Sequence, residues 1–169
     1  MSYQAKYGAL LDDIANEADS IAMSYFRGGA LGMERKRDGT VVTQADKRIE
    51  QMAIAKVKAS RLPMDVVGEE TSAEAPKGPA TNGRARMIID PIDGTEEFTR
   101  GIPTFGTLLG IEEDAEIVAG MVSAPALEKG ARWWAYRGEG AWRHGQRLKV
   151  STVSGLAESM IFTTGTGPS

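Results

Sequence analysis

Residues 87–95 read Met87-Ile88-Ile89-Asp90-Pro91-Ile92-Asp93-Gly94-Thr95, an apolar run that ends in two carboxylates, a glycine and a threonine. The apolar part is typical of a β-strand, and the Asp-Gly step after it favours a turn. A short helix over residues 95–100 is predicted to follow. We therefore expect a strand that delivers Asp90 and Asp93, three residues apart, into this turn.

Two helices are predicted before this strand. Apolar residues recur at spacings of three and four over residues 3–26, which indicates a long amphipathic helix. It is expected to stop at Arg27-Gly28-Gly29, because paired glycines remove the barrier to positive φ. The second helix is predicted over residues 43–60, with Leu62-Pro63 as its breaker. Residues 72–83, rich in Pro, Gly and Ala, are expected to form an exposed loop.

The rest of the chain carries short β-type runs. Strands are predicted over residues 65–67, 87–89, 105–111, 117–123, 132–136 and 147–150. The connections after residue 105 are too short to hold a crossover helix, so these strands are expected to be antiparallel neighbours. The predicted fold class is α+β, with two amino-terminal helices packed on one side of an antiparallel sheet.

Composition excludes several classes of protein. The 169 residues correspond to about one domain, and 41% hydrophobic with 25% charged residues is typical of a globular fold. A net charge of −3 argues against a nucleic-acid partner, and the lack of cysteine excludes disulfides and thiolate metal sites. No apolar run is long enough to span a membrane, and no signal peptide is recognised, so a cytoplasmic location is expected. His144 lies in a predicted turn and is expected at the surface.

The carboxylates of the opening segment suit a hard divalent cation. Mg²⁺ binds through one or two carboxylates, and Asp90 with Asp93 can share two such ions. The predicted helix after Gly94 would present its first N–H groups to a phosphate. Residues 66–70, Val-Val-Gly-Glu-Glu, repeat the design of an apolar strand that ends in acids and can supply a third carboxylate.

Each of these features also has a purely structural explanation. Asp90-Pro91 fits an ordinary strand-ending turn, and Glu69-Glu70 fits a solvated pair. Asp46 fits the acidic position of a capping box that begins at Thr43. The basic run at residues 35–37 fits either a solvated turn or a contact for an anionic substrate. Taken singly, the residues leave these alternatives open.

In combination, the segments resemble the inositol monophosphatase family of Mg²⁺-dependent phosphomonoesterases. The matching segments are residues 38–46 (DGTVVTQAD), 68–70 (GEE) and 89–95 (IDPIDGT), with Phe98, Gly101 and Pro103 after them. The resemblance continues through residues 122–126 and 132–142, and the latter stretch is most similar to the histidinol-phosphatase branch. It implies a layered α/β sandwich of the inositol monophosphatase/fructose-1,6-bisphosphatase type. Residues 1–169 would be its amino-terminal metal-binding domain, with the second sheet domain missing.

The resemblance also implies the metal ligands. Glu69, Asp90 and the backbone carbonyl of Ile92 would hold a first Mg²⁺, and Asp90 with Asp93 would hold a second. Family members carry a later Trp-Asp motif whose aspartate completes the second site. We therefore expect residues 1–169 alone to be a poor enzyme.

Catalytic and substrate-binding roles follow from the same resemblance. Glu69 and Thr95 would orient the attacking water, and Asp46 would support the threonine, which is compatible with a capping role. Asp93, Gly94 and Thr95 would bind the phosphate group, and the loop around Lys36 would close over it. Glu97 departs from the family, which usually has asparagine before Phe98.

The implied activity is hydrolysis of a small phosphate monoester with Mg²⁺, without a covalent phosphoenzyme. Histidinol phosphate, from histidine biosynthesis, is the expected substrate, with inositol monophosphate and 3′-phosphonucleotides as alternatives. An alternative of another class is a catalytically silent module that binds metal or phosphate. For the assembly of the protein, a homodimer is an alternative to a monomer. A regulatory, RNA-associated role is known for some relatives, but the negative net charge argues against it here.

Overall fold

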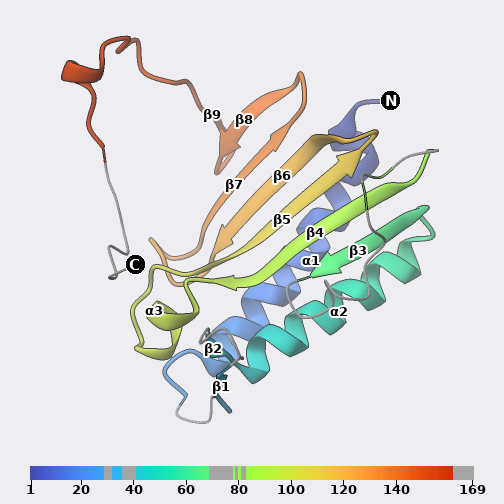
Figure 1. Ribbon diagram of the computed structural model, residues 1–169, viewed down its shortest axis with the longest axis vertical. Helices are drawn as coiled ribbons and strands as arrows, with labels where there is room; N and C mark the ends of the chain where they lie inside the picture. The colour runs from blue at the N-terminus through green and yellow to red at the C-terminus, as the bar shows by residue number, and fades with distance from the viewer. Residues whose placement is uncertain (29–31, 36–40, 69–77, 79, 81–82, 162–169) are drawn as a thin grey trace.

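The computed structural model describes residues 1–28, 32–35, 41–68, 78, 80 and 83–161. Two long helices cover one face of a seven-stranded sheet, and a two-stranded sheet lies near one end of the molecule (Figure 1). The elements are α1 (Tyr3–Tyr25), β1 (Glu34–Arg35), β2 (Val41–Val42), α2 (Gln44–Ser60), β3 (Met64–Gly68), β4 (Ala85–Asp93), α3 (Thr95–Thr99), β5 (Gly106–Glu113), β6 (Glu116–Ala124), β7 (Ala131–Tyr136), β8 (Gly140–Arg143), β9 (Gln146–Arg147) and the 3₁₀-helix η1 (Leu156–Glu158).

The large sheet is mixed, which corrects the prediction of an antiparallel one. Its strand order is β3-β4-β5-β6-β7-β8-β9, and β3 runs parallel to β4 while every later pair is antiparallel. Parallel neighbours need a long crossover connection, and residues 69–84 between β3 and β4 supply the length. The predicted loop at residues 72–83 lies largely outside the described residues.

Both long helices form as predicted, but the residue with a positive φ after α1 is not the predicted glycine. Arg27 adopts the left-handed conformation, with φ of 61°, and Gly28 does not. Nε and Nη2 of Arg27 donate to the Gly101 carbonyl at 3.4 and 3.3 Å, and these contacts help to hold the strained backbone. Gly29 lies outside the described residues.

The last predicted strand, residues 147–150, is wrong except at Arg147, which lies in β9. β8 and β9 instead form a hairpin around His144 and Gly145, whose φ angles are 46° and 78°. Two positive φ angles match the twist that a two-residue hairpin needs. His144 is exposed, as predicted. The described residues 148–161 contain no strand, and η1 is their only helix.

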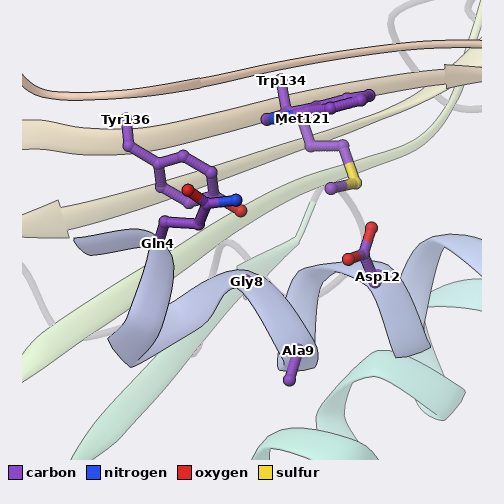
Figure 2. Close-up of a pocket in the computed structure, with 7 residues that line it drawn as sticks. All are labelled: Gln4, Gly8, Ala9, Asp12, Met121, Trp134 and Tyr136. Carbon is purple, nitrogen blue, oxygen red and sulfur yellow. The ribbon is translucent and has the colours of Figure 1, made fainter. Parts of the chain in front are cut away.

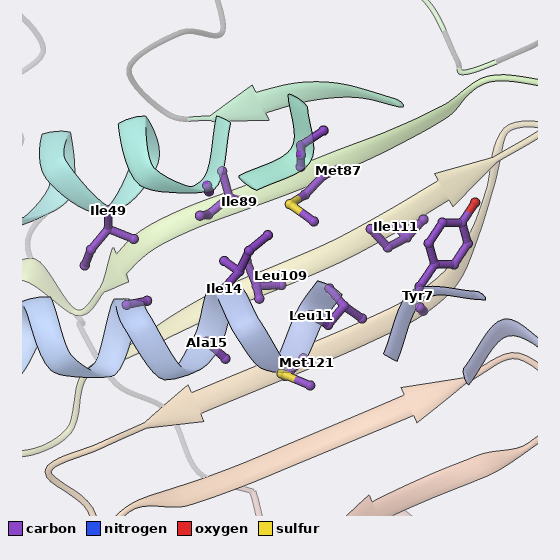
Figure 3. Close-up of a cluster of buried hydrophobic side chains, with 14 of the residues drawn as sticks. Tyr7, Leu11, Ile14, Ala15, Ile49, Met87, Ile89, Leu109, Ile111 and Met121 are labelled. Atoms are coloured by element: carbon purple, nitrogen blue, oxygen red, sulfur yellow. The ribbon is translucent and has the colours of Figure 1, made fainter. Parts of the chain in front are cut away.

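The core lies between the two long helices and the central strands (Figure 3). Leu11 and Ile14 of α1, Ile49 of α2, Met87 of β4 and Ile111 of β5 are all fully buried. These contacts fix β4, and with it the carboxylates at its end, relative to both helices. None of the described helices is both long and apolar enough to cross a membrane.

A polar cluster ties the start of α1 to the end of β5. The Glu113 carboxylate accepts hydrogen bonds from the Lys6 ammonium and the Tyr7 hydroxyl. Burial raises the pKa of Tyr7 to about 12, and the bond to Glu113 acts in the same direction. Burial alone would raise the pKa of Glu113, but the hydrogen bonds from Lys6 and Tyr7 outweigh it and hold that pKa below its usual value.

Candidate metal and phosphate site

An irregularity in β4 determines where its two carboxylates lie. Asp90 pairs with Leu108 of β5 and Asp93 pairs with Gly106, so three steps along β4 match two along β5. This is the geometry of a β-bulge, which inserts one extra residue and re-aims the side chains after it. Because Leu108 and Gly106 are two residues apart, they share a face of β5. The bulge therefore brings Asp90 and Asp93 to one side of the sheet.

That side is the one away from the long helices. Met87 and Ile89 are buried against the helices, whereas Ile88 is 39% exposed on the opposite face. Side chains alternate along a strand, so Asp90 shares the face of Ile88. Asp90 is half-buried and Asp93 is exposed. Asp93 is therefore accessible from the open face of the sheet, whereas Oδ1 of Asp90 is buried.

Gly94 makes the turn between β4 and α3. Its φ of 82° and ψ of 41° are left-handed, and a Cβ there would lie 2.9 Å from the Thr104 carbonyl oxygen. Both the conformation and the close approach require glycine. The Gly94 carbonyl accepts the first backbone hydrogen bond of α3, from Phe98 at 2.9 Å. The expected phosphate-binding residues, Gly94 and Thr95, thus form the turn and the first residue of α3 directly after Asp93.

Two threonine hydroxyls hold the backbone of the bulge. Thr95 Oγ1 donates to the Ile92 carbonyl at 2.8 Å, and the buried Thr107 donates to the Pro91 carbonyl at 2.8 Å. A carbonyl oxygen has two lone pairs, so Ile92 keeps acceptor capacity for a metal ion. Sequence reasoning missed Thr107, and a hydroxyl residue within the otherwise apolar predicted strand over residues 105–111 was the available signal.

Asp46 takes the capping position that its spacing predicts. Its Oδ2 accepts hydrogen bonds from the Thr43 amide at 2.9 Å and the Thr43 hydroxyl at 2.6 Å, and Asp46 is 2% exposed. Thr43 follows β2 directly, and β2 contacts α3. The start of α2, which carries Asp46, therefore lies at the same end of the molecule as Thr95.

Three aromatic rings anchor α3 beside the end of α1. The ring centroids of Phe26, Phe98 and Phe105 lie 4.8 to 5.9 Å apart. Phe98 is 1% exposed, and such aromatic packing stabilises beyond the area that it buries. The cluster fixes the position of the short helix that begins at Thr95.

Two expected site residues, Glu69 and Lys36, lie outside the described residues. The neighbouring part of the fold is described: Gly68 ends β3 and pairs with Ile89, the residue before Asp90. In the part of the chain that the structure describes, no three histidine, cysteine, aspartate or glutamate side chains gather closely enough to hold a metal ion. Of the expected metal-binding carboxylates, the described residues thus provide Asp90 and Asp93. The role expected for Glu69 stays a prediction.

A separate pocket lies between α1 and strands β6 and β7 (Figure 2). Gln4, Gly8, Ala9, Asp12, Met121, Trp134 and Tyr136 line it. Phe26 follows the carboxyl end of α1 and packs on α3, which begins at the candidate site. A helix rises 1.5 Å per residue, so Gly8 of the pocket lies about 27 Å along α1 from Phe26. This pocket is therefore distinct from the carboxylate site, and no expected site residue lines it.

Comparison with known proteins bears on the family and the fold of this chain. Residues 6–168 match the inositol monophosphatase family. A histidinol-phosphatase of Streptomyces coelicolor is 39% identical over 86% of this chain and 55% of its own length. An inositol-1-monophosphatase of Rhizobium meliloti is 31% identical over 96% of this chain and 59% of its own length. The solved structure of an extragenic suppressor protein from Bartonella henselae superposes with a TM-score of 0.73 at 25% identity, covering 88% of this chain and 55% of that one.

The chain thus spans a little over half the length of these relatives. The residues matched to the family, 6–168, include the bulge with Asp90 and Asp93, the Gly94 turn and the capped start of α2. Over the part that the solved structures cover, this chain has the inositol monophosphatase/fructose-1,6-bisphosphatase fold. The chain belongs to the inositol monophosphatase family.

Proposed function

We propose that residues 1–169 form the amino-terminal metal-binding domain of a Mg²⁺-dependent phosphate monoester hydrolase. The observation that carries the proposal is the bulge that brings Asp90 and Asp93 to one face, next to the Ile92 carbonyl and the Gly94 turn. All of these donors are oxygen atoms, which Mg²⁺ prefers over nitrogen and sulfur. The donor set therefore fits the ion that the family resemblance implies.

Each residue has a defined part in this proposal. Asp90 would contact both ions, while Asp93 and the Ile92 carbonyl would each contact one, and Glu69 would complete the first site. Bound Mg²⁺ would neutralise the charge of the phosphate ester and lower the pKa of a coordinated water. The polypeptide would supply the ligands and hold them in fixed positions.

Thr95 would orient the attacking water. Its hydroxyl donates to the Ile92 carbonyl, so its own oxygen keeps lone pairs that can accept a hydrogen bond from water. Asp46 holds the start of α2 through Thr43 at the same end of the molecule. The backbone N–H groups of Gly94 and Thr95, with Lys36, would bind the phosphate oxygens.

We propose histidinol phosphate as the substrate. Support comes from relatives named histidinol-phosphatase, which are 36% and 39% identical to this chain. Inositol 1-phosphate is the second candidate, because the Rhizobium meliloti relative covers 96% of the chain at 31% identity. Glu97 adds a carboxylate beside the Gly94 turn, with Oε2 3.5 Å from the position of a Cβ on Gly94.

The test compares both esters on the protein encoded by the complete reading frame. We expect kcat/KM for histidinol phosphate to exceed that for inositol 1-phosphate by at least about tenfold, equivalent to roughly 1.4 kcal/mol of differential transition-state binding. The Asp90→Asn variant is the control for metal-dependent hydrolysis. A reversed ratio would refute the substrate and leave the reaction class, whereas Mg²⁺ binding without hydrolysis of either ester would favour a silent metal-binding module.

A further inference from the structure

A second buried carboxylate lies one helical turn after Asp46 on α2. Glu50 is 2% exposed, and its side chain packs against Gly68, the last residue of β3. A Cβ built on Gly68 would lie 2.1 Å from the carboxylate carbon of Glu50 and 2.2 and 2.6 Å from its oxygens. The carboxylate therefore occupies the space that a side chain at position 68 would need.

The glycine at position 68 is explained by this contact and not by its backbone. Gly68 has no positive φ, so any residue could adopt its conformation. Glu50 is buried and has little room to withdraw, which makes even a methyl group at position 68 disruptive. The two residues form a fitted pair that joins helix α2 to the carboxyl end of β3.

The pair is connected to the candidate site through the sheet. Gly68 pairs with Ile89, whose next neighbour along β4 is Asp90. Ile89 is buried on the helix side of the sheet, whereas Asp90 lies on the open face. Glu50 and Asp90 are therefore on opposite faces, so Glu50 acts on the site through the paired backbone and not as a ligand of the same ion.

A buried carboxylate is an expensive way to fill this space. Burying a charged group carries a large desolvation penalty, and an apolar side chain of similar volume often stabilises a protein more. Stability alone therefore gives little reason for a glutamate at position 50. A better reason for a glutamate is that it sets a defined spacing between α2 and the strand ends.

We propose that Glu50 is a positioning residue for the metal site. Fitted against Gly68, it fixes the distance between α2 and the paired ends of β3 and β4, and thereby the placement of Asp90. The inference rests on the proposed function, because it takes Asp90 to be a metal ligand.

The experiment measures Mn²⁺ binding by electron paramagnetic resonance, since Mn²⁺ accepts the same oxygen ligands as Mg²⁺. We expect Glu50→Ala to raise the Mn²⁺ Kd about tenfold, as loss of supporting residues around metal sites commonly does. Glu50→Gln, which keeps the length and shape, should stay within about twofold of the wild-type protein. A Kd for Glu50→Gln as high as that for Glu50→Ala would overturn the proposal, because the charge rather than the fit would then matter.

Two further variants separate positioning from stability. Val57→Ala is the matched control: Val57 is also 2% exposed and lies two turns further along α2, toward the start of β3. It should lower Tm while leaving the Mn²⁺ Kd within about twofold. Gly68→Ala should weaken binding in the wild-type protein but add nothing in the Glu50→Ala background. Equal Kd changes for Val57→Ala and Glu50→Ala, or additive effects at positions 50 and 68, would refute the positioning role.

A metal-free measurement keeps this inference distinguishable from the proposed function. In ¹⁵N–¹H NMR spectra, Glu50→Ala and Gly68→Ala should shift the amide signals of residues 89, 90 and 92–94, and Val57→Ala should not. Unchanged signals would overturn the inference. Absence of Mn²⁺ binding to the wild-type protein, or binding that Asp90→Asn does not weaken, would refute the metal site instead.

Discussion

Replacing Gly94 by alanine tests the turn on which the candidate site is built. The substitution has two costs, and the structure separates them. A non-glycine residue in the left-handed region costs roughly 1–2 kcal/mol. The new Cβ would also lie 2.9 Å from the Thr104 carbonyl oxygen, and overpacking of this kind typically costs about 1–3 kcal/mol.

Gly138 provides the matched control for the first cost. It has a φ of 75°, close to the 82° of Gly94, but a Cβ there would meet nothing within 4 Å. Gly138→Ala should therefore lower the free energy of unfolding by about 1–2 kcal/mol, and Gly94→Ala by about 2–5 kcal/mol. For a domain of this size, each kcal/mol corresponds to a fall in Tm of about 2–4 °C.

Urea unfolding followed by circular dichroism measures both free energies, and an unchanged m-value shows that the comparison is valid. Mg²⁺ titration of the same variants adds a functional readout, because only Gly94 adjoins the carboxylates. We expect Gly94→Ala to weaken Mg²⁺ binding and Gly138→Ala to leave it unchanged. Equal losses of stability in the two variants would refute the argument that contact with Thr104 makes glycine necessary at position 94.

Three other predictions follow from the structure. Asp90→Asn should weaken Mg²⁺ binding more than Asp93→Asn, because Asp90 would contact both ions; calorimetric titration that finds the two equal would contradict the shared-ligand assignment. The folded pKa of Tyr7 is raised from 10.0 to about 12, so the stability that its hydroxyl contributes is complete below pH 10 and is lost as the pH rises toward 12. In urea unfolding, the free energy of unfolding of Tyr7→Phe should therefore fall less over this pH range than that of the wild-type protein. The folded pKa of Glu113 is lowered, so the stability that its carboxylate contributes is present at neutral pH and is lost as the pH falls below the usual glutamate range. The free energy of unfolding of Glu113→Gln should therefore change less with pH on the acid side.

The parts of the fold that depend on local patterns were predictable from the sequence. The spacing of Thr43 and Asp46 predicted a capping box, and the structure confirms it with both hydrogen bonds. The apolar run before Asp90 predicted a strand that ends in a turn, which β4 and Gly94 confirm. In each case the interacting groups lie within a few residues of one another, so the sequence contains the whole interaction.

Features that depend on pairing between distant segments were not predictable. In a regular strand, a spacing of three places Asp90 and Asp93 on opposite faces, and only the register with β5 shows the bulge that brings them together. The parallel pairing of β3 with β4 has no signature within either strand. Glu50 resembled an ordinary polar residue of an amphipathic helix, because its partner Gly68 belongs to another element.

The candidate site therefore combines two kinds of restraint. Local devices set the individual groups: the capping box holds Asp46, and the Thr95 hydroxyl holds the Ile92 carbonyl. Distant contacts set their relative positions: the β3–β4 register brings the end of β3 beside β4, and the aromatic cluster fixes α3 against α1. A metal site tolerates little displacement of its ligands, so substitutions in the distant contacts should impair metal binding while secondary structure is retained.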